Sequence, residues 1–157
     1  MARIGYCNKI NGDDIAKAKL NEVSCSPKHA IEISKFIVNM TAENAIDYLE
    51  QVIDLKKAVP FHRFTRNVAH KRCLNGKKMG QVSGRYPVKA ATEYVRLIRS
   101  AQKNAEYKGL NPEKMVIIHS SANKGRCMKA IFPRAMGRAT PKHRDTVNIE
   151  LILREVQ

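Results

Sequence analysis

The residues of this chain best suited to chemistry are cations that lie close together near its carboxyl end. Residues 132–144 read "FPRAMGRATPKHR" and contain Arg134, Arg138, Lys142 and Arg144 but no carboxylate. Guanidinium and ammonium groups at this density bind phosphate oxygens through charge-assisted hydrogen bonds. The segment has little apolar surface to bury, so it gains little free energy by packing against its own protein. We therefore expect a polyanionic partner to hold it.

Charge is distributed along the whole chain in blocks of one sign. The net charge is +15 and the isoelectric point is about 9.9. Residues 56–89 hold ten cations and residues 114–144 hold eight, with no acid in either block. A solvated protein surface normally mixes both signs, so blocks of one sign favour contact with phosphate. This charge balance indicates a nucleic acid as the partner.

Residue patterns typical of catalysis or of cofactor binding are absent from the sequence. There is no phosphate-cradling glycine-rich loop with its lysine, no H-E-x-x-H, no G-x-S-x-G and no paired carboxylates. The cysteines, at Cys7, Cys25, Cys73 and Cys127, lack the C-x-x-C spacing of structural zinc sites, so we expect free thiols. We therefore predict no enzymatic activity, no cofactor and no metal.

Aromatic residues are too scattered to form a stacking platform for single-stranded nucleic acid. Tryptophan is absent, and Phe61, Phe64 and Phe132 are not arranged in a series. Recognition is therefore expected to depend on shape and phosphate, with little reading of bases.

Three helices are expected to build the body that carries these cations. The first is predicted over residues 26–40 with Ser26 as its N-cap, and the second over residues 41–57 with Thr41 as its N-cap. The third, over residues 87–109, has a continuous apolar stripe and ends at a glycine. Between the second and third helices the periodicity fails, which predicts an irregular basic loop at about residues 58–86.

Two strands are expected to flank the cationic segment near the carboxyl end. "MVIIHS", from residue 115, has strand propensity, and "DTVNIELILREV", from residue 145, alternates apolar and polar residues. A hairpin that joins them would form a ribbon over about residues 121–145 with its tip near Met136-Gly137. At about 3.3 Å per residue, the ribbon would project roughly 30 Å from the body. A third strand is predicted around residues 16–23.

Together these elements predict an α+β fold with three helices packed on a small antiparallel three-stranded sheet. A chain of 157 residues suits one domain, so residues 1–157 are expected to form a single unit with the long projecting hairpin and the basic irregular loop as appendages. The sequence has no signal peptide and no apolar stretch that would span a membrane, which predicts an intracellular protein.

Four segments of the chain, in the same order, resemble one protein family. They read "SPKHAIEISKFIVNM", "DYLEQVIDLKKAVPFHRF", "GRYPVKAATEYVRLIRSAQKNAEYKGL" and "FPRAMGRATPKHRDTVNIELIL". The last includes P-R-A-x-G-R-A at residues 133–139. The chain is similar to the universal large-subunit ribosomal protein twenty-two family, in its archaeal and eukaryotic branch. The basic eukaryotic C-terminal extension is missing, so the archaeal version is the closer match.

This resemblance implies a structural protein of the large ribosomal subunit in the cytoplasm, which binds large-subunit rRNA and supports subunit assembly. It also implies that the hairpin lines the nascent-polypeptide exit tunnel. The implied tunnel tip comprises Ala135, Met136, Gly137 and Arg138. The cations to which rRNA binding is assigned are Arg63, Arg66, Lys71, Arg72, Lys77, Lys78, Arg85, Lys89, Arg126, Lys129, Arg134, Arg138, Lys142 and Arg144.

Partners expected from the same resemblance are large-subunit rRNA, neighbouring ribosomal proteins and the nascent polypeptide, with no membrane and no obligate homo-oligomer. One departure concerns the first strand, "AKAKLNEVSC", where Asn21 and Glu22 stand in place of more basic residues. RNA contact by that strand is left open.

Two other classes of protein share the charge pattern. An architectural nucleic-acid-binding protein outside the ribosome would place the ribbon in a groove of duplex DNA. A nucleic-acid-modifying enzyme would need an acidic pair in one of the basic blocks, and neither block contains one.

Overall fold

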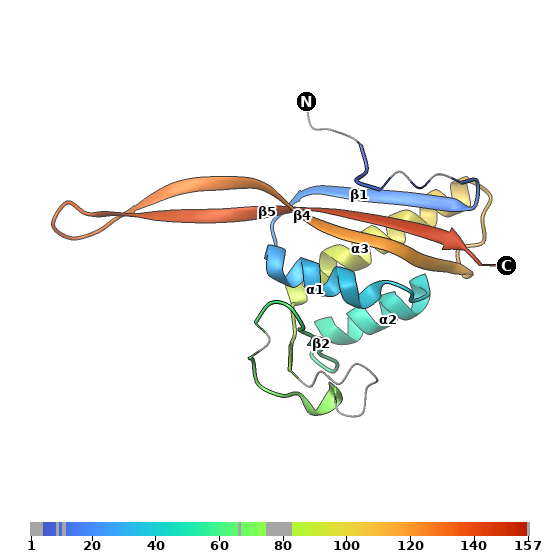
Figure 1. Ribbon diagram of the computed structural model, residues 1–157, viewed down its shortest axis with the longest axis horizontal. Helices are drawn as coiled ribbons and strands as arrows, with labels where there is room; N and C mark the ends of the chain where they lie inside the picture. Colours follow the sequence, from blue (N-terminus) through green and yellow to red (C-terminus); the bar gives the residue numbers. More distant parts are fainter. Residues whose placement is uncertain (1–4, 9, 11, 66, 75–82, 157) are drawn as a thin grey trace.

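A computed structural model shows a body of helices and sheet from which two strands extend as a long arm (Figure 1). It describes residues 5–8, 10, 12–65, 67–74 and 83–156. The order of the elements is β1 (Ile15–Val23), α1 (Pro27–Ile37), α2 (Ala42–Ile53), β2 (Val59–Pro60), a 3-10 turn (Arg72–Leu74), β3 (Gly84–Arg85), α3 (Val88–Tyr107), β4 (Met115–Pro133) and β5 (Ala139–Glu155). The predicted α+β class is confirmed.

The main sheet is antiparallel and has the strand order β1-β5-β4. Ala18 of β1 lies opposite Leu151 of β5, and Leu151 lies opposite Ser120 of β4. The pairing of β4 with β5 continues far beyond the end of β1. It runs from Met115 opposite Glu155 to Pro133 opposite Ala139. The body is therefore three strands wide, whereas the arm consists of β4 and β5 alone.

The three helices cover one face of the sheet (Figure 1). Apolar side chains of β1, β4 and β5 form a single buried cluster with those of all three helices. On α3 the predicted apolar stripe is buried from Ala91 to Ala105, and Tyr94 adds its ring to the core. The Tyr94 hydroxyl donates a hydrogen bond of 2.9 Å to the Ala30 carbonyl of α1, which joins these two helices inside the core.

Both amino-terminal helices end earlier than the sequence predicted. Helix α1 stops at Ile37, because Asn39 adopts a positive φ of 66° and its N–H donates to the Ile117 carbonyl of β4 at 2.8 Å. Helix α2 stops at Ile53, and Leu55 has a φ of 62°. Thr41 caps α2 as predicted by accepting from the Asn44 N–H at 3.4 Å, whereas the Ser26 side chain makes no capping hydrogen bond.

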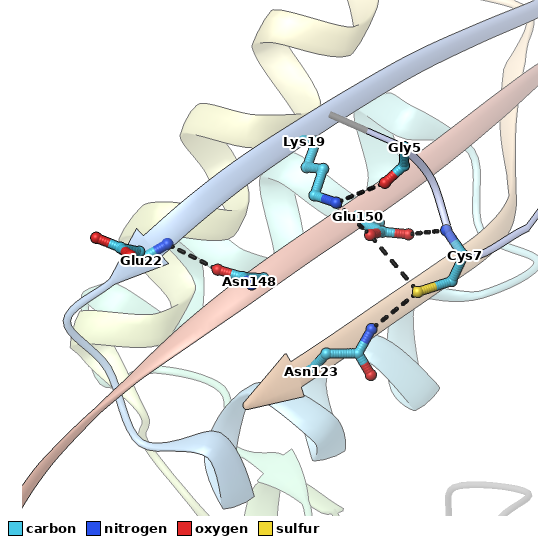
Figure 2. Close-up of polar contacts among 7 residues, drawn as sticks. All are labelled: Gly5, Cys7, Lys19, Glu22, Asn123, Asn148 and Glu150. Carbon is cyan, nitrogen blue, oxygen red and sulfur yellow. Dashed lines mark hydrogen bonds and ion pairs between the residues drawn. The ribbon is translucent and has the colours of Figure 1, made fainter. Parts of the chain in front are cut away.

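The face of the sheet away from the helices is partly covered by the chain that precedes β1 (Figure 2). Glu150 of β5 accepts hydrogen bonds from the Cys7 N–H and from the Lys19 ammonium, both at 2.8 Å. Glu150 is one of the polar residues of the alternating pattern in β5, yet only 2% of its surface is exposed. The Asn123 amide donates to the Cys7 sulfur at 3.2 Å, so β4 also holds this amino-terminal segment.

Within the described residues, no helix is both long enough and apolar enough to cross a bilayer.

Candidate nucleic-acid interface

The arm is exposed along its whole outer part. Every residue from 128 to 144 is exposed, so this part of β4 and β5 has no cover from the body. The strands are closed by a hydrogen bond of 2.8 Å from the Arg134 N–H to the Arg138 carbonyl. Between them Met136 and Gly137 both have positive φ, 58° and 68°. Two successive positive φ values are typical of the tight hairpin turns that match the twist of the strands.

Two arginines of the arm are held in place by neighbouring side chains. Arg134 lies over the Phe132 ring at 5.0 Å, and its Nε donates to the Thr140 hydroxyl at 3.0 Å. Nearer the body, Arg144 donates two hydrogen bonds to the Ser24 hydroxyl, at 3.1 and 2.8 Å. Their guanidinium groups are therefore partly oriented before any partner binds, which lowers the entropy cost of binding.

At the base of the arm, one acid pairs with a cation. Lys124 lies 3.0 Å from the Asp145 carboxylate. Hydrogen bonds from Lys124 and then from the Cys127 thiol hold the pKa of Asp145 below its usual range. Beyond this pair the arm carries cations without acids, as the sequence indicated.

The basic loop leaves and re-enters the body through a narrow base. Strands β2 and β3 pair antiparallel, with Val59 opposite Arg85 and Pro60 opposite Gly84. A side chain on Gly84 would meet the Val59 carbonyl oxygen at 2.6 Å and Leu74 at 2.7 Å, so only glycine allows this close approach. The two ends of the loop are therefore fixed side by side on the body.

The cations predicted to bind RNA in this block lie on and around that base. Arg63, Arg72, Arg85 and Lys89 are exposed, and Lys71 is partly buried. The Arg63 guanidinium lies 5.1 Å from the centre of the Phe64 ring, and the Lys71 ammonium lies 5.2 Å from that of Tyr86. Arg66, Lys77 and Lys78 lie outside the described residues.

The predicted site residues fall on two surfaces rather than one. The arm and the basic loop leave the body in different directions (Figure 1). Arg126, Lys129, Arg138 and Lys142 are exposed on the arm together with the two held arginines. A partner that uses all of these cations must therefore be large enough to reach both surfaces.

Sequence reasoning missed the acid that organises the basic loop. Glu32 of α1 is 1% exposed, and its carboxylate accepts hydrogen bonds from the backbone N–H groups of residues 62–64. The only sequence signal is an isolated acid beside the apolar stripe of α1, which also fits a solvated helix position.

Metal chemistry gains no support from the described part of the chain. No group of three or more His, Cys, Asp or Glu side chains lies close enough there to hold an ion. The cysteines are free thiols, and Cys25 lies in the core, where burial raises the pKa of its thiol to about 11.

Comparison with known proteins connects this geometry to one family. A family model described as "Ribosomal protein L22p/L17e" matches residues 18–154. The "Large ribosomal subunit protein uL22" of Methanocorpusculum labreanum is 73% identical over 157 residues, which cover all of both chains. The proteins of the same name from Methanoregula boonei and Methanocaldococcus jannaschii are 58% and 44% identical, over 99% of this chain in each case and over 99% and 97% of their own. All three organisms are archaea, which agrees with the archaeal character of the sequence.

Proposed function

The chain belongs to the ribosomal protein L22p/L17e family, and from this premise we propose that it is a structural component of the large ribosomal subunit in the cytoplasm. In this role it binds large-subunit rRNA through the arm and the basic loop. Its body contacts neighbouring ribosomal proteins, and it requires no cofactor, no catalytic group and no second copy of itself.

The exposed, acid-free outer arm is the observation that carries this proposal. Residues 128–144 contain five cations and no acid, and every residue in this range is exposed. A two-stranded ribbon alone is marginally stable in water, and its like charges repel one another. Phosphates along both sides of the ribbon would neutralise that charge and stabilise the paired strands. A folded rRNA is large enough to do so while it also contacts the basic loop, and by joining the two surfaces it would support subunit assembly.

We further propose that the tip of the arm forms part of the wall of the nascent-polypeptide exit tunnel. At residues 135–138 the tip is narrow, because Ala135 and Gly137 leave little side-chain volume on either side of Met136. Met136 is 91% exposed at the end of the turn. Cations farther back along the arm would anchor it in RNA, which leaves Met136 and Arg138 to face a passing polypeptide.

Sedimentation and competition experiments test rRNA binding and subunit membership. The endogenous protein should sediment with the large subunit in moderate salt, and the purified protein should prefer folded large-subunit rRNA to duplex DNA of equal length. A preference for the duplex, together with absence from the subunit, would refute the proposal and favour an architectural DNA-binding protein.

Shortening the arm tests the role at the tunnel separately. Replacing residues 130–142 with a tight turn should leave incorporation into the large subunit largely intact, because the basic loop and the body remain. Stalling of tunnel-sensitive peptides or sensitivity to tunnel-binding drugs should then change. If the shortened protein enters ribosomes and every such readout matches the parent, the tip does not contribute to the tunnel wall.

A further inference from the structure

A buried carboxylate of α1 holds the first residues of the basic loop. The Glu32 side chain accepts hydrogen bonds from the N–H groups of His62 at 3.1 Å, Arg63 at 2.9 Å and Phe64 at 2.7 Å. The first of these uses one carboxylate oxygen and the other two share the second oxygen. Hydrogen bonds to an ionised acceptor are about twice as strong as those between neutral groups.

Three successive N–H groups that point at one anion fix the backbone that carries them. Such an arrangement is an anion-binding concavity, and here the anion comes from the protein itself. Because the three N–H groups point inward to Glu32, the side chains of His62 and Arg63 are left on the outside, where both are exposed. The backbone of Arg63 is therefore held by a hydrogen bond to Glu32 of α1.

The segment before this bend is also fixed. Phe61 is fully buried, and its ring lies 5.4 Å from that of His29 on α1. The Phe61 N–H donates to the Ser83 carbonyl at 3.1 Å, which ties the entry of the loop to its exit. Outside the bend, the Arg63 guanidinium lies over the Phe64 ring at 5.1 Å. The result is a bend that is tied to α1 and to the loop exit, with a cation and an aromatic ring at its surface.

We propose that Glu32 is a positioning residue for RNA binding, which presents Arg63 to the RNA by holding the backbone of residues 62–64. This inference rests on the proposed function and adds a specific contact to it. Glu32 does not touch the RNA. It converts the beginning of the basic loop into a preformed contact, so that less conformational entropy is lost when RNA binds.

The sign of the mutational effect separates this role from simple electrostatics. Glu32→Gln removes one negative charge from a protein of net charge +15, so general attraction to RNA alone would become stronger. Positioning predicts the opposite, because an amide cannot accept from all three N–H groups as the carboxylate does. Glu43 is an exposed acid in the first turn of α2, so Glu43→Gln is a control with the same change in charge.

The experiment measures the affinity of the full-length protein for a full-length transcript of large-subunit rRNA. Glu32→Gln is expected to bind about three- to tenfold more weakly than wild type, whereas Glu43→Gln should bind equally well or more tightly. Arg63→Ala should also bind more weakly. The double variant Glu32→Gln, Arg63→Ala should bind about as Arg63→Ala does, because both changes remove the same contact.

Several outcomes would overturn the inference. It is wrong if Glu32→Gln binds as tightly as Glu43→Gln, if Arg63→Ala binds as wild type, or if the two losses multiply in the double variant. Should Glu32→Gln not fold, hydrogen exchange of the RNA-free wild type decides the matter. Protected amides at residues 62–64 would support a preformed bend, and exchange at the rate of unstructured chain would refute it. A wild type that binds rRNA no better than duplex DNA would instead refute the proposed function.

Discussion

Replacing Glu150 by glutamine should destabilise the body without changing the arm or the basic loop. Glu150 lies on the face of the sheet away from the helices, where it bonds to Lys19 and to the Cys7 N–H (Figure 2). Its side chain is 2% exposed and that of Lys19 is 14% exposed. The carboxylate of this ion pair is therefore shielded from solvent, and the Lys19 side chain is largely shielded.

The expected loss follows from leaving a mostly buried ammonium without its counter-ion. Removing one partner of a fully buried ion pair costs about 3–5 kcal/mol. Lys19 keeps a hydrogen bond of 2.8 Å to the Gly5 carbonyl and some contact with water, so the loss should be smaller than for a fully buried pair. We expect Glu150→Gln to lower the free energy of unfolding by about 2–3 kcal/mol. The control Asp54→Asn breaks the exposed Lys56–Asp54 pair and should cost less than about 1 kcal/mol.

Acid should remove this difference between wild type and Glu150→Gln. Burial raises the pKa of Glu150, but hydrogen bonds from Lys19 and from the Cys7 N–H together bring the pKa below its ordinary value of 4.5. Because the pKa is lower in the folded protein than in the unfolded chain, the stabilisation is complete well above pH 4.5 and disappears as the pH falls through the folded pKa. Urea unfolding followed by circular dichroism, at neutral and at acidic pH, measures both effects.

Two results would refute this reasoning. The first is a free energy of unfolding for Glu150→Gln within about 0.5 kcal/mol of wild type at neutral pH, because that is the range of an ordinary surface substitution. The second is a difference between the two proteins that persists unchanged in acid, because the carboxylate would then not be its source.

Three further predictions address the core, the arm and the RNA. Tyr94→Phe should lower the free energy of unfolding by about 1–2 kcal/mol, because the Ala30 carbonyl loses a buried hydrogen bond, and thermal or urea unfolding would detect this. In the RNA-free protein, amides of residues 128–144 should exchange faster than those of α3, and strong protection of the arm without RNA would contradict an arm that depends on its partner. Affinity for rRNA should fall by roughly 10³ to 10⁵ between about 50 and 200 mM salt if about six to ten cations meet phosphates. The dependence of affinity on salt should become weaker in a variant with four neutralised cations of the basic block, namely Arg63, Arg66, Lys71 and Arg72. An unchanged salt dependence would mean that this block does not contact the RNA.

Much of the body was predictable because its signals are local. The apolar stripe of α3, from Ala91 to Ala105, recurs at helical spacing and is buried as that spacing requires. Thr41 precedes the apolar stripe of α2 and accepts a backbone hydrogen bond as an N-cap does. Residues within one or two turns of each other determine these features, so a single sequence contains the information.

The contacts missed by sequence reasoning join residues that are far apart along the chain. Glu32 is 30 residues from His62, and Cys7 is 143 residues from Glu150. The apolar members of the alternation in β5 lie in the buried core cluster: Val147, Ile149, Leu151 and Leu153. The pattern carries no sign that another segment covers the outer face at Glu150. Which of the protein's acids are buried is therefore decided by tertiary contacts, which a local pattern does not encode.

The arm's apolar side chains limit how an RNA partner can be arranged around it. Ile131 and Phe132 are 73% and 50% exposed, and as neighbours in one strand they point to opposite faces of the ribbon. A partner that lay along one face would leave the other apolar side chain in water, and phosphate contacts alone would cover neither. The sequence predicts recognition by shape and phosphate. Nucleobase faces packed against Ile131, and against Phe132 beside the Arg134 guanidinium, would add apolar contact on both faces of the ribbon. We therefore expect the arm to be enclosed within folded RNA rather than to rest on its surface, with the cations of the arm meeting phosphates around its edges.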